Sequence, residues 1–245
     1  MIYKAIILAA GHGKRMGDLC AKIPKPMLLI ENKPIIEHTI QELFKCGIKE
    51  IGINTFYHSN IIEKYIQEQS YSNVITLIKE DKLSGTAGAL TLFKDFLKED
   101  ENFIVIAGDI LTDFDYKRLI NFHLQNNALG TFAYHERSQS NSYLEILNQR
   151  KEGEVSYFSE RPNKEEIKKI NHSTWKINSS IYCFNQEVLN LIPSQEESDI
   201  PRDLFPKLLK EKRLFTLPLQ ANRWAIDSSE RLEKARKEFI NRDSI

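Results

Sequence analysis

The chain has 245 residues, of which 41% are hydrophobic and 28% are charged, as in an ordinary globular protein. Its 34 Lys and Arg residues balance 34 Asp and Glu residues, which argues against nucleic acid as a partner. No apolar run is long enough to span a membrane, and we expect no secretion leader and no membrane partner. Cys20, Cys46 and Cys183 lack metal-ligand spacing, so we expect reduced thiols in a cytoplasmic protein.

Strands and helices alternate in the first half of the chain. This alternation predicts an α/β fold with a parallel sheet and crossover helices. The apolar run 103-FIVIA-107 is typical of a strand that helices cover on both faces. The predicted order is a strand ending at Leu8, a helix over 34–46, a strand over 51–53, a helix capped by Ser59 or Asn60, a strand over 74–78, a helix over 86–97, a strand over 103–107 and a helix capped by Asp113 or Asp115.

The pattern changes from Leu129 onward, where strand-like segments dominate. We expect a single domain over residues 1–245, with a β-rich half that begins at about residue 129. The predicted elements of this half are strands at 131–135, 143–147, 155–159 and 180–184, a hairpin turn at 150–154, a polar surface segment at 162–174, and helices near 186–191, 201–211 and 229–241.

The segment 8-LAAGHGKRMGDLCAKIPKP-26 follows the first strand and is both glycine-rich and cationic. Gly11 and Gly13 let backbone N–H groups approach phosphate oxygens, and Arg15 and Lys25 can offset negative charge. The alternative is a turn with solvated charges. Neither a Walker A motif nor a complete dinucleotide-binding fingerprint is present. The prolines on either side of Lys25 keep a helix from starting there.

Three further segments carry chemistry. The segment 85-GTAGAL-90 opens a helix whose N–H groups can face a phosphate, unless Thr86 only caps it. Asp109 ends a buried strand beside the glycine-rich loop, where a carboxylate suits Mg²⁺. Asp227 precedes a helix, so it is either an N-cap or a second Mg²⁺ ligand.

Seven short segments occur in one order along nearly the whole chain, to about residue 240. They are 8-LAAGHGKRM-16, 24-PKP-26, 85-GTAG-88, 108-GD-109, 160-ERP-162, 178-NSSIY-182 and Asp227. Each is weak alone, but in this order they resemble the sugar-1-phosphate nucleotidyltransferases. Two segments, 108-GDILTDFD-115 and 197-ESDIPRDLFPKLL-209, look most like the mannose- or heptose-1-phosphate guanylyltransferase branch.

The resemblance implies the reaction NTP + sugar 1-phosphate → NDP-sugar + pyrophosphate, with Mg²⁺ as cofactor. It implies a Rossmann-like, mostly parallel sheet flanked by helices in the nucleotide-binding half, to about residue 128, and a sugar-binding β-rich half. The catalytic residues implied are Arg15, Lys25 and Asp109, and the metal ligands are Asp109 and Asp227. Those implied to bind nucleotide are Leu8, Ala9, Ala10, Gly11, Gly13, Glu80, Gly85, Thr86 and Ala87. Those implied to face the sugar are Glu160 and Asn178.

The choice of base depends on Glu80, at a position where the family often reads the base. A carboxylate accepts two hydrogen bonds side by side, and guanine offers adjacent N1–H and N2–H₂ donors. Glu80 therefore favours GTP. An exposed Glu80 at a strand end, or Asp81 in its place, are open alternatives.

This sequence departs from the family pattern at four places. Gly-Lys-Arg at 13–15 replaces Gly-Thr-Arg and adds only charge. The other three lie in the sugar-binding half: 160-ERP-162 for Glu-Lys-Pro, 178-NSS-180 for Asn-Ala-Gly and 227-DSSE-230 for Asp-Ile-Gly-Thr. They favour a less common acceptor. A cytidylyl- or uridylyltransferase for another phosphorylated acceptor, and a non-catalytic nucleotide-sensing homologue, stay open, as does homodimer formation.

Overall fold

The computed structural model describes residues 2–98, 101–138, 142–147, 151–169, 174–193 and 197–240. The chain forms two compact units, each assembled from several segments. Unit 1 contains Met1–Ile2, Ser84–Val105 and Asp115–Gln220, and unit 2 contains Tyr3–Leu83, Ile106–Phe114 and Ala221–Ile245. The single-domain organisation with a division near residue 128 stays a prediction.

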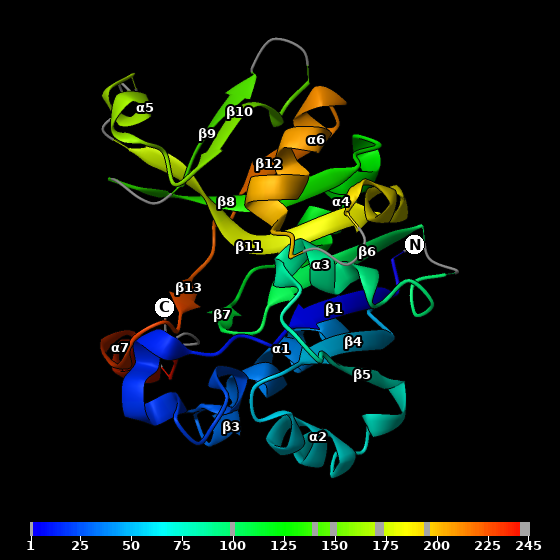
Figure 1. The fold of residues 1–245 in the computed structure, drawn as a ribbon, viewed down its shortest axis with the longest axis vertical. Helices are drawn as coiled ribbons and strands as arrows, with labels where there is room; N and C mark the ends of the chain where they lie inside the picture. Colours follow the sequence, from blue (N-terminus) through cyan, green and yellow to red (C-terminus); the bar gives the residue numbers. More distant parts are fainter. Residues whose placement is uncertain are drawn as a thin grey trace. The chain divides into compact units, whose positions relative to one another are not determined.

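Unit 2 is built on parallel strands, as the alternation predicted. Strand β4 pairs in parallel with β1 and with β5, and the strand order is β5-β4-β1-β6 (Figure 1). Leu8 lies opposite Asn54, which lies opposite Ile78, so the carboxyl ends of three strands share one edge. The elements are β1 (Lys4–Leu8), 3₁₀ turns at Lys14–Cys20 and Lys25–Met27, β2 (Leu29–Ile30), β3 (Lys33–Pro34), α1 (Ile35–Lys45), β4 (Glu50–Thr55), α2 (Ser59–Gln67), a 3₁₀ turn at Ser72–Val74, β5 (Ile75–Lys79), the end of β6 (Asn102–Ala107), β7 (Ile110–Thr112), β13 (Arg223–Ala225) and α7 (Ser229–Phe239).

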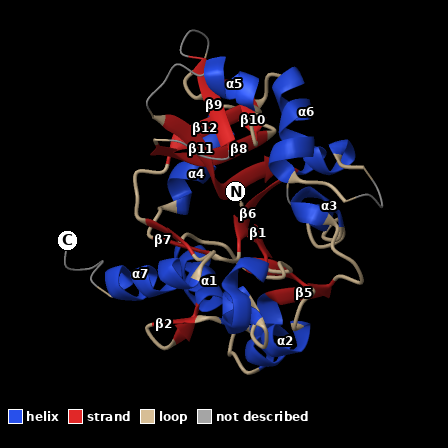
Figure 2. Ribbon diagram, turned by 60° about the vertical axis from the view of Figure 1, so that its left-hand side comes forward, coloured by secondary structure: helices blue, strands red, loops and turns tan. Residues whose placement is uncertain are grey.

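Segments from both ends of the chain form one core within unit 2. Helices α1 and α7 lie side by side in Figure 2, and the rings of His38 and Phe239 are 4.9 Å apart. β13 pairs antiparallel with β7. The buried cluster joins the segment after β1 to α7 through Met16, Cys20, Leu28, Ile30, Ile35, Leu111, Trp224, Ile226, Leu232, Ala235 and Phe239.

Unit 1 is β-rich, as predicted. Its strands run in the order β11-β8-β12-β10-β9, with β6 beside β11 (Figure 1). The pairs β11–β8, β10–β12 and β10–β9 are antiparallel, and β12–β8 is parallel. The elements are α3 (Gly85–Thr91), the start of β6, α4 (Tyr116–Gln125), β8 (Gly130–Arg137), β9 (Ser142–Leu147), β10 (Glu154–Glu160), α5 (Lys164–Lys169), β11 (Trp175–Asn185), a 3₁₀ turn at Gln186–Leu191, a π-helical turn at Ile200–Leu204, α6 (Phe205–Lys210) and β12 (Leu214–Pro218).

Several predicted boundaries were wrong. The helix expected over 86–97 ends at Thr91, whose hydroxyl donates to the Gly88 carbonyl at 2.7 Å and so competes with the helical bonds. Helix α2 begins at Ser59 after a left-handed His58, without a side-chain cap. The polar segment 162–174 contains a helix, α5, and residues 170–173 lie outside the described residues. The expected hairpin turn over 150–154 begins at residue 150, which lies outside the described residues. The last helix was expected to reach residue 241, which lies outside the described residues as well.

Helices of the described residues are all too short or too polar to cross a membrane. The cysteines Cys20, Cys46 and Cys183 are free thiols, as predicted.

Candidate functional site

The loop after β1 folds closely on itself at Gly13. This residue has φ of +65°, and a Cβ there would lie 3.0 Å from the Cβ of Cys20 and 3.2 Å from Cγ of Lys25. The left-handed backbone therefore favours glycine, and a side chain there would also press on Cys20 and Lys25. A Cβ on Gly11 would meet no atom within 4 Å, so the backbone at Gly11 is sterically accessible.

Lys25 joins this loop to the carboxyl end of β6. Its side chain is 11% exposed, and its Nζ donates to Oδ2 of Asp109 at 3.1 Å. Pro24 is extended and Pro26 lies in the first turn of a three-residue 3₁₀ segment, so the flanking prolines prevent a longer helix, as predicted.

Asp109 follows a close approach of two strands. The N–H of Gly108 donates to the Leu8 carbonyl at 2.9 Å, and a Cβ on Gly108 would lie only 3.0 Å from that oxygen. The Asp109 carbonyl accepts from the N–H of Ile226 at 2.9 Å, so Asp227 is in the adjoining segment. Asp115, rather than Asp109, caps α4, as the sequence indicated.

Asp227 is not an N-cap, because the hydroxyl of Ser228 caps α7. Instead, its carboxylate pairs with two arginines. Oδ2 accepts from Nη1 of Arg15 at 3.2 Å, and Oδ1 accepts from Nη1 of Arg231 at 2.8 Å. Arg15 is 74% exposed and Asp227 is 21% exposed. Arg231 belonged to no motif; only its position four residues after Asp227 in a helix could have pointed to it.

The two aspartates fit a divalent metal in their donor chemistry. Hard carboxylate oxygens are the ligands that Mg²⁺ prefers, and Mg²⁺ usually takes one or two protein carboxylates together with phosphate oxygens and water. Within the described residues no cluster of three or more His, Cys, Asp or Glu side chains forms a metal cage. Both carboxylates are already paired with cations, so they are positioned where positive charge is stabilised.

Glu80 is buried, with 5% exposure, which removes the alternative of an exposed strand-end carboxylate. Its Oε1 accepts from Nδ2 of Asn54 at 2.6 Å. Oδ1 of the same Asn54 accepts from the N–H of Ala9 at 2.8 Å. Ala9 and Ala10 are buried at the end of β1, whereas Asp81 is exposed. Sequence reasoning missed Asn54, although a polar residue near the carboxyl end of the strand 50-EIGINT-55 was a visible signal.

The remaining predicted residues lie in unit 1. Gly85 has φ of +78°, and a Cβ there would lie 2.3 Å from the Ser198 carbonyl oxygen. That oxygen accepts from the N–H groups of Ala87 and Gly88 at 2.8 and 3.1 Å. In this structure the N–H groups of Ala87 and Gly88 therefore donate within the chain, and the expectation that this helix start faces a phosphate stays a prediction. Thr86 is not the cap, because its hydroxyl donates to Oδ2 of Asp199 at 3.0 Å.

Glu160 ends β10 in a mixed electrostatic environment. Burial, followed by the negative charge of Asp199, raises the pKa of Glu160 to about 7, and Arg161 and Arg202 oppose this shift. Sequence reasoning did not single out Asp199 or Arg202. They lie in the segment 197-ESDIPRDLFPKLL-209, which it used only to choose a family branch.

Asn178 shapes an irregularity in β11. Its Oδ1 accepts from the N–H of Ser180 at 2.8 Å, and its Nδ2 donates to the Tyr182 hydroxyl at 2.8 Å. Ser180 has φ of +59°, and the register with β8 shifts between Asn178 and Tyr182. A serine thus takes the left-handed conformation that suits the glycine of the family pattern.

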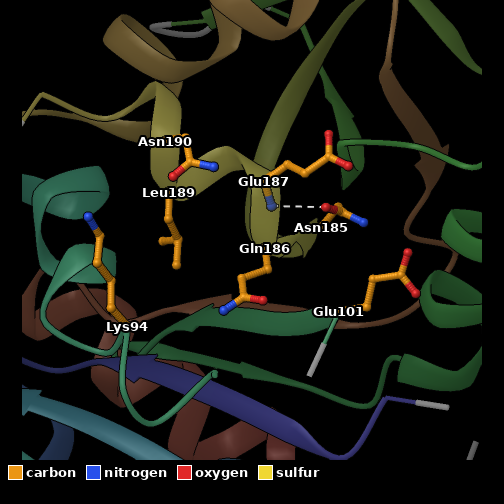
Figure 3. Close-up of a pocket in the computed structure, with 7 residues that line it drawn as sticks. All are labelled: Lys94, Glu101, Asn185, Gln186, Glu187, Leu189 and Asn190. Atoms are coloured by element: carbon orange, nitrogen blue, oxygen red, sulfur yellow. Dashed lines mark hydrogen bonds between the residues drawn. The ribbon is translucent and has the colours of Figure 1, made fainter. Parts of the chain in front are cut away.

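Unit 1 also contains a pocket of about 350 Å³ that no motif indicated (Figure 3). No residue of the predicted site lines it. Its lining residues are Lys94, Glu101, Asn185, Gln186, Glu187, Leu189 and Asn190.

Comparison with known proteins identifies the family. Residues 4–225 match the Nucleotidyl transferase family, so the chain belongs to that family. Members of this family generally use a divalent metal. The family assignment confirms the resemblance drawn from the seven segments.

Among individual proteins, the chain is 31% identical over 220 residues to the mannose-1-phosphate guanylyltransferase catalytic subunit beta of Xenopus tropicalis. It is 30% identical over 221 residues to the mannose-1-phosphate guanyltransferase of Saccharomyces cerevisiae. Each match covers 89% of this chain and 59% of the relative, so the chain matches less than two thirds of their length. The crystal structure of HddC from Yersinia pseudotuberculosis is similar, with a TM-score of 0.79, 24% identity and coverage of 97% of this chain and 100% of that one. This likeness confirms the Rossmann-like fold class.

Proposed function

We propose that the chain transfers GMP from GTP to a mannose- or heptose-like sugar 1-phosphate, giving a GDP-sugar and pyrophosphate. One observation carries the proposal: in unit 2, two cations of the glycine-rich loop, Arg15 and Lys25, are each paired with a carboxylate suited to a metal. Two polyanions and a divalent cation would use the same four side chains, Arg15, Lys25, Asp109 and Asp227.

The chemistry requires positioning more than proton transfer. The sugar phosphate oxygen is already an anionic nucleophile, so no general base is needed, and charge compensation with alignment supplies the rate. The exposed Arg15 guanidinium suits forked contact with phosphate, and Lys25 acts as a point charge held in place by packing. Backbone at Gly11 and Gly13 would approach the triphosphate.

We assign the metal as Mg²⁺, held by Asp109 and Asp227. When bound, Mg²⁺ would neutralise charge on the phosphates of the two substrates. Glu160 and Asn178 in unit 1 are assigned to the sugar, and Leu8, Ala9, Ala10, Gly85, Thr86 and Ala87 to the nucleotide. The three free thiols support a reducing compartment, and we place the reaction in the cytoplasm.

The preference for guanine is supported by two facts. Glu80 is a buried carboxylate held by a side-chain donor. The relatives in Xenopus tropicalis and Saccharomyces cerevisiae are named as a mannose-1-phosphate guanylyltransferase subunit and a mannose-1-phosphate guanyltransferase. The alternative, cytidylyl or uridylyl transfer to another phosphorylated acceptor, is supported by the altered segments at 160–162 and 178–180.

The test measures pyrophosphate release from four NTPs against a panel of sugar 1-phosphates and other phosphorylated acceptors. We expect GTP with a mannose- or heptose-like 1-phosphate to give the highest kcat/KM. A maximum with CTP or UTP would favour the alternative. Tight GTP binding without pyrophosphate release from any pair would favour a nucleotide-sensing homologue.

A further inference from the structure

One buried side chain, that of Asn54, connects two parts of the proposed nucleotide site. Asn54 is 3% exposed and lies opposite Leu8 in the register of β4 with β1. Its Oδ1 accepts from the N–H of Ala9 at 2.8 Å, and its Nδ2 donates to Oε1 of Glu80 at 2.6 Å. The side chain therefore links the start of the glycine-rich loop to the carboxylate assigned to the base.

The orientation of the Asn54 amide is fixed by its two neighbours. A backbone N–H can only donate, so the oxygen of Asn54 must face Ala9. Oε1 of Glu80 accepts in the other contact, so the amide nitrogen must face Glu80. Reversing the amide would break both bonds and leave buried polar groups unsatisfied, which is costly. The amide thus has one stable orientation.

The same contacts constrain Glu80 in position. Its backbone N–H donates to the Thr55 carbonyl at 2.8 Å, next to Asn54 in β4. A buried carboxylate needs donors to offset the loss of water, and Asn54 supplies one. A carboxylate has two oxygens and about four lone-pair sites, so one bond from Asn54 does not exhaust its capacity to accept.

Building on the proposed function, we propose that Asn54 is a positioning residue for base selection. Its amide holds the Glu80 carboxylate at a fixed place relative to the phosphate-binding backbone at Ala9. The base and the phosphates belong to one nucleotide. Guanine N1–H and N2–H₂ therefore reach that carboxylate only if it lies at the right distance from the backbone that binds the phosphates. A loss of the Asn54–Glu80 bond therefore lowers the preference for GTP over other NTPs, rather than lowering the use of all NTPs equally.

Three variants test this role. Asn54→Asp keeps an oxygen for the Ala9 N–H, removes the donor to Glu80 and adds a like charge beside it. Glu80→Gln removes the base-reading carboxylate. The double variant, Asn54→Asp with Glu80→Gln, restores a hydrogen bond of reversed polarity, because the introduced amide can donate to the introduced carboxylate. Asn60→Asp, on an exposed position of α2, is the matched control for the same chemical change.

The readouts are kcat/KM for GTP relative to ATP, CTP and UTP, direct binding of GTP and ATP by calorimetry, and thermal unfolding, all at pH 8. A hydrogen bond to a charged group is worth a factor of about 10 to 100, so we expect each single variant to lose GTP preference by about tenfold or more. We expect the double variant to regain thermal stability but not GTP preference, and to be no less selective than Glu80→Gln. This non-additivity identifies the two residues as one unit.

An Asn54→Asp variant that keeps the wild-type GTP preference while losing rate with all four NTPs would overturn the inference, since Asn54 would then serve only the loop. A preference that falls in Asn54→Asp but not in Glu80→Gln would overturn it too. If the wild type releases no pyrophosphate, the proposed function fails. The ratio of the GTP and ATP dissociation constants, measured by calorimetry for wild type and variants, then decides the role of Asn54 by the same criteria.

Discussion

Asp109 and Asp227 are paired with cations of the loop that we assign to the triphosphate. Because of this position, each of the two carboxylates has opposite effects on phosphate binding with and without a metal. It repels phosphate when no metal is present and supports phosphate binding through a metal when one is.

We therefore expect Asp227→Asn and Asp109→Asn each to lower Mg²⁺-dependent pyrophosphate release by about a hundredfold or more, because a metal contributes several kcal/mol of charge stabilisation. The same variants should bind GTP more tightly than wild type when EDTA removes the metal, since a negative charge near the phosphates is gone. Calorimetry with and without Mg²⁺ checks the change of sign. Asp95→Asn, on an exposed turn, is the control. Near-normal turnover with unchanged Mg²⁺ dependence would rule out the metal assignment.

Glu160 gives a pH dependence of stability. Its pKa is raised from 4.5 to about 7 in the folded chain, so the folded state holds a proton that the unfolded state releases between these values. Its contribution to stability is greatest below pH 4.5 and is lost as pH rises to about 7. The free energy of unfolding of wild type relative to Glu160→Gln should fall from pH 5 to pH 7 and then level off. Urea unfolding at several pH values checks this, with exposed Glu165→Gln as control. A difference that stays constant with pH would contradict it.

At the scale of elements, the start of α3 depends on the chain around Ser198. Gly85 has a positive φ, and a Cβ would overlap the Ser198 carbonyl oxygen. We expect Gly85→Ala to lower the free energy of unfolding by about 1–3 kcal/mol, through left-handed strain and displacement of that carbonyl. Gly11→Ala, where a Cβ meets nothing within 4 Å, should leave thermal stability nearly unchanged. Equal melting temperatures for the two variants would contradict this account.

The sequence allowed the parallel half to be predicted because its signals are local. A few neighbouring residues are enough to predict each of these features: the strand at 103-FIVIA-107, the helix that starts after Pro34, and the loop with glycines at 11 and 13. The cap of α4 by Asp115 was likewise local. The site contacts that were missed depend on partners far along the chain. The Ser198 carbonyl accepts from the N–H groups of Ala87 and Gly88, and no local pattern indicates this contact. Asn54 is a polar residue near the end of its strand, but nothing near it in the sequence indicates that its partner is Glu80.

At the scale of the whole molecule, the order of segments in space differs from their order in the chain. Unit 2 takes its core from the loop after β1 and from β13 and α7 near the other end. The ring of Phe239 lies 5.3 Å from that of Trp224 and 4.9 Å from that of His38. The segment that carries the proposed metal ligand Asp227 is therefore held by packing between α7 and segments near the start of the described chain.

Phe239→Ala should consequently lower the free energy of unfolding by about 3–5 kcal/mol, as for other buried phenylalanines. It should also weaken GTP binding in the presence of Mg²⁺, because the segment that carries the proposed metal ligand Asp227 packs through this ring. Fluorescence of Trp224 in a Trp175→Phe background follows unit 2 alone, since the chain has 2 Trp residues and Trp175 belongs to unit 1. Ile240→Ala, at a position 60% exposed, is the control and should change neither property. A Phe239→Ala variant as stable as the control would exclude this role for the ring.

The pairing of β7 with β13 also determines when, during synthesis, the two proposed metal ligands can come together. Asp109 leaves the ribosome well before Arg223–Ala225, the strand that aligns Asp227 beside it. At roughly 5–20 residues per second the interval is on the order of ten seconds. During that interval Lys25 and Asp109 can pair, but Arg15 has no aspartate from the later segment. A ribosome-bound nascent chain that ends before residue 223 should therefore have only one of the two proposed metal ligands, Asp109, although its glycine-rich loop is complete.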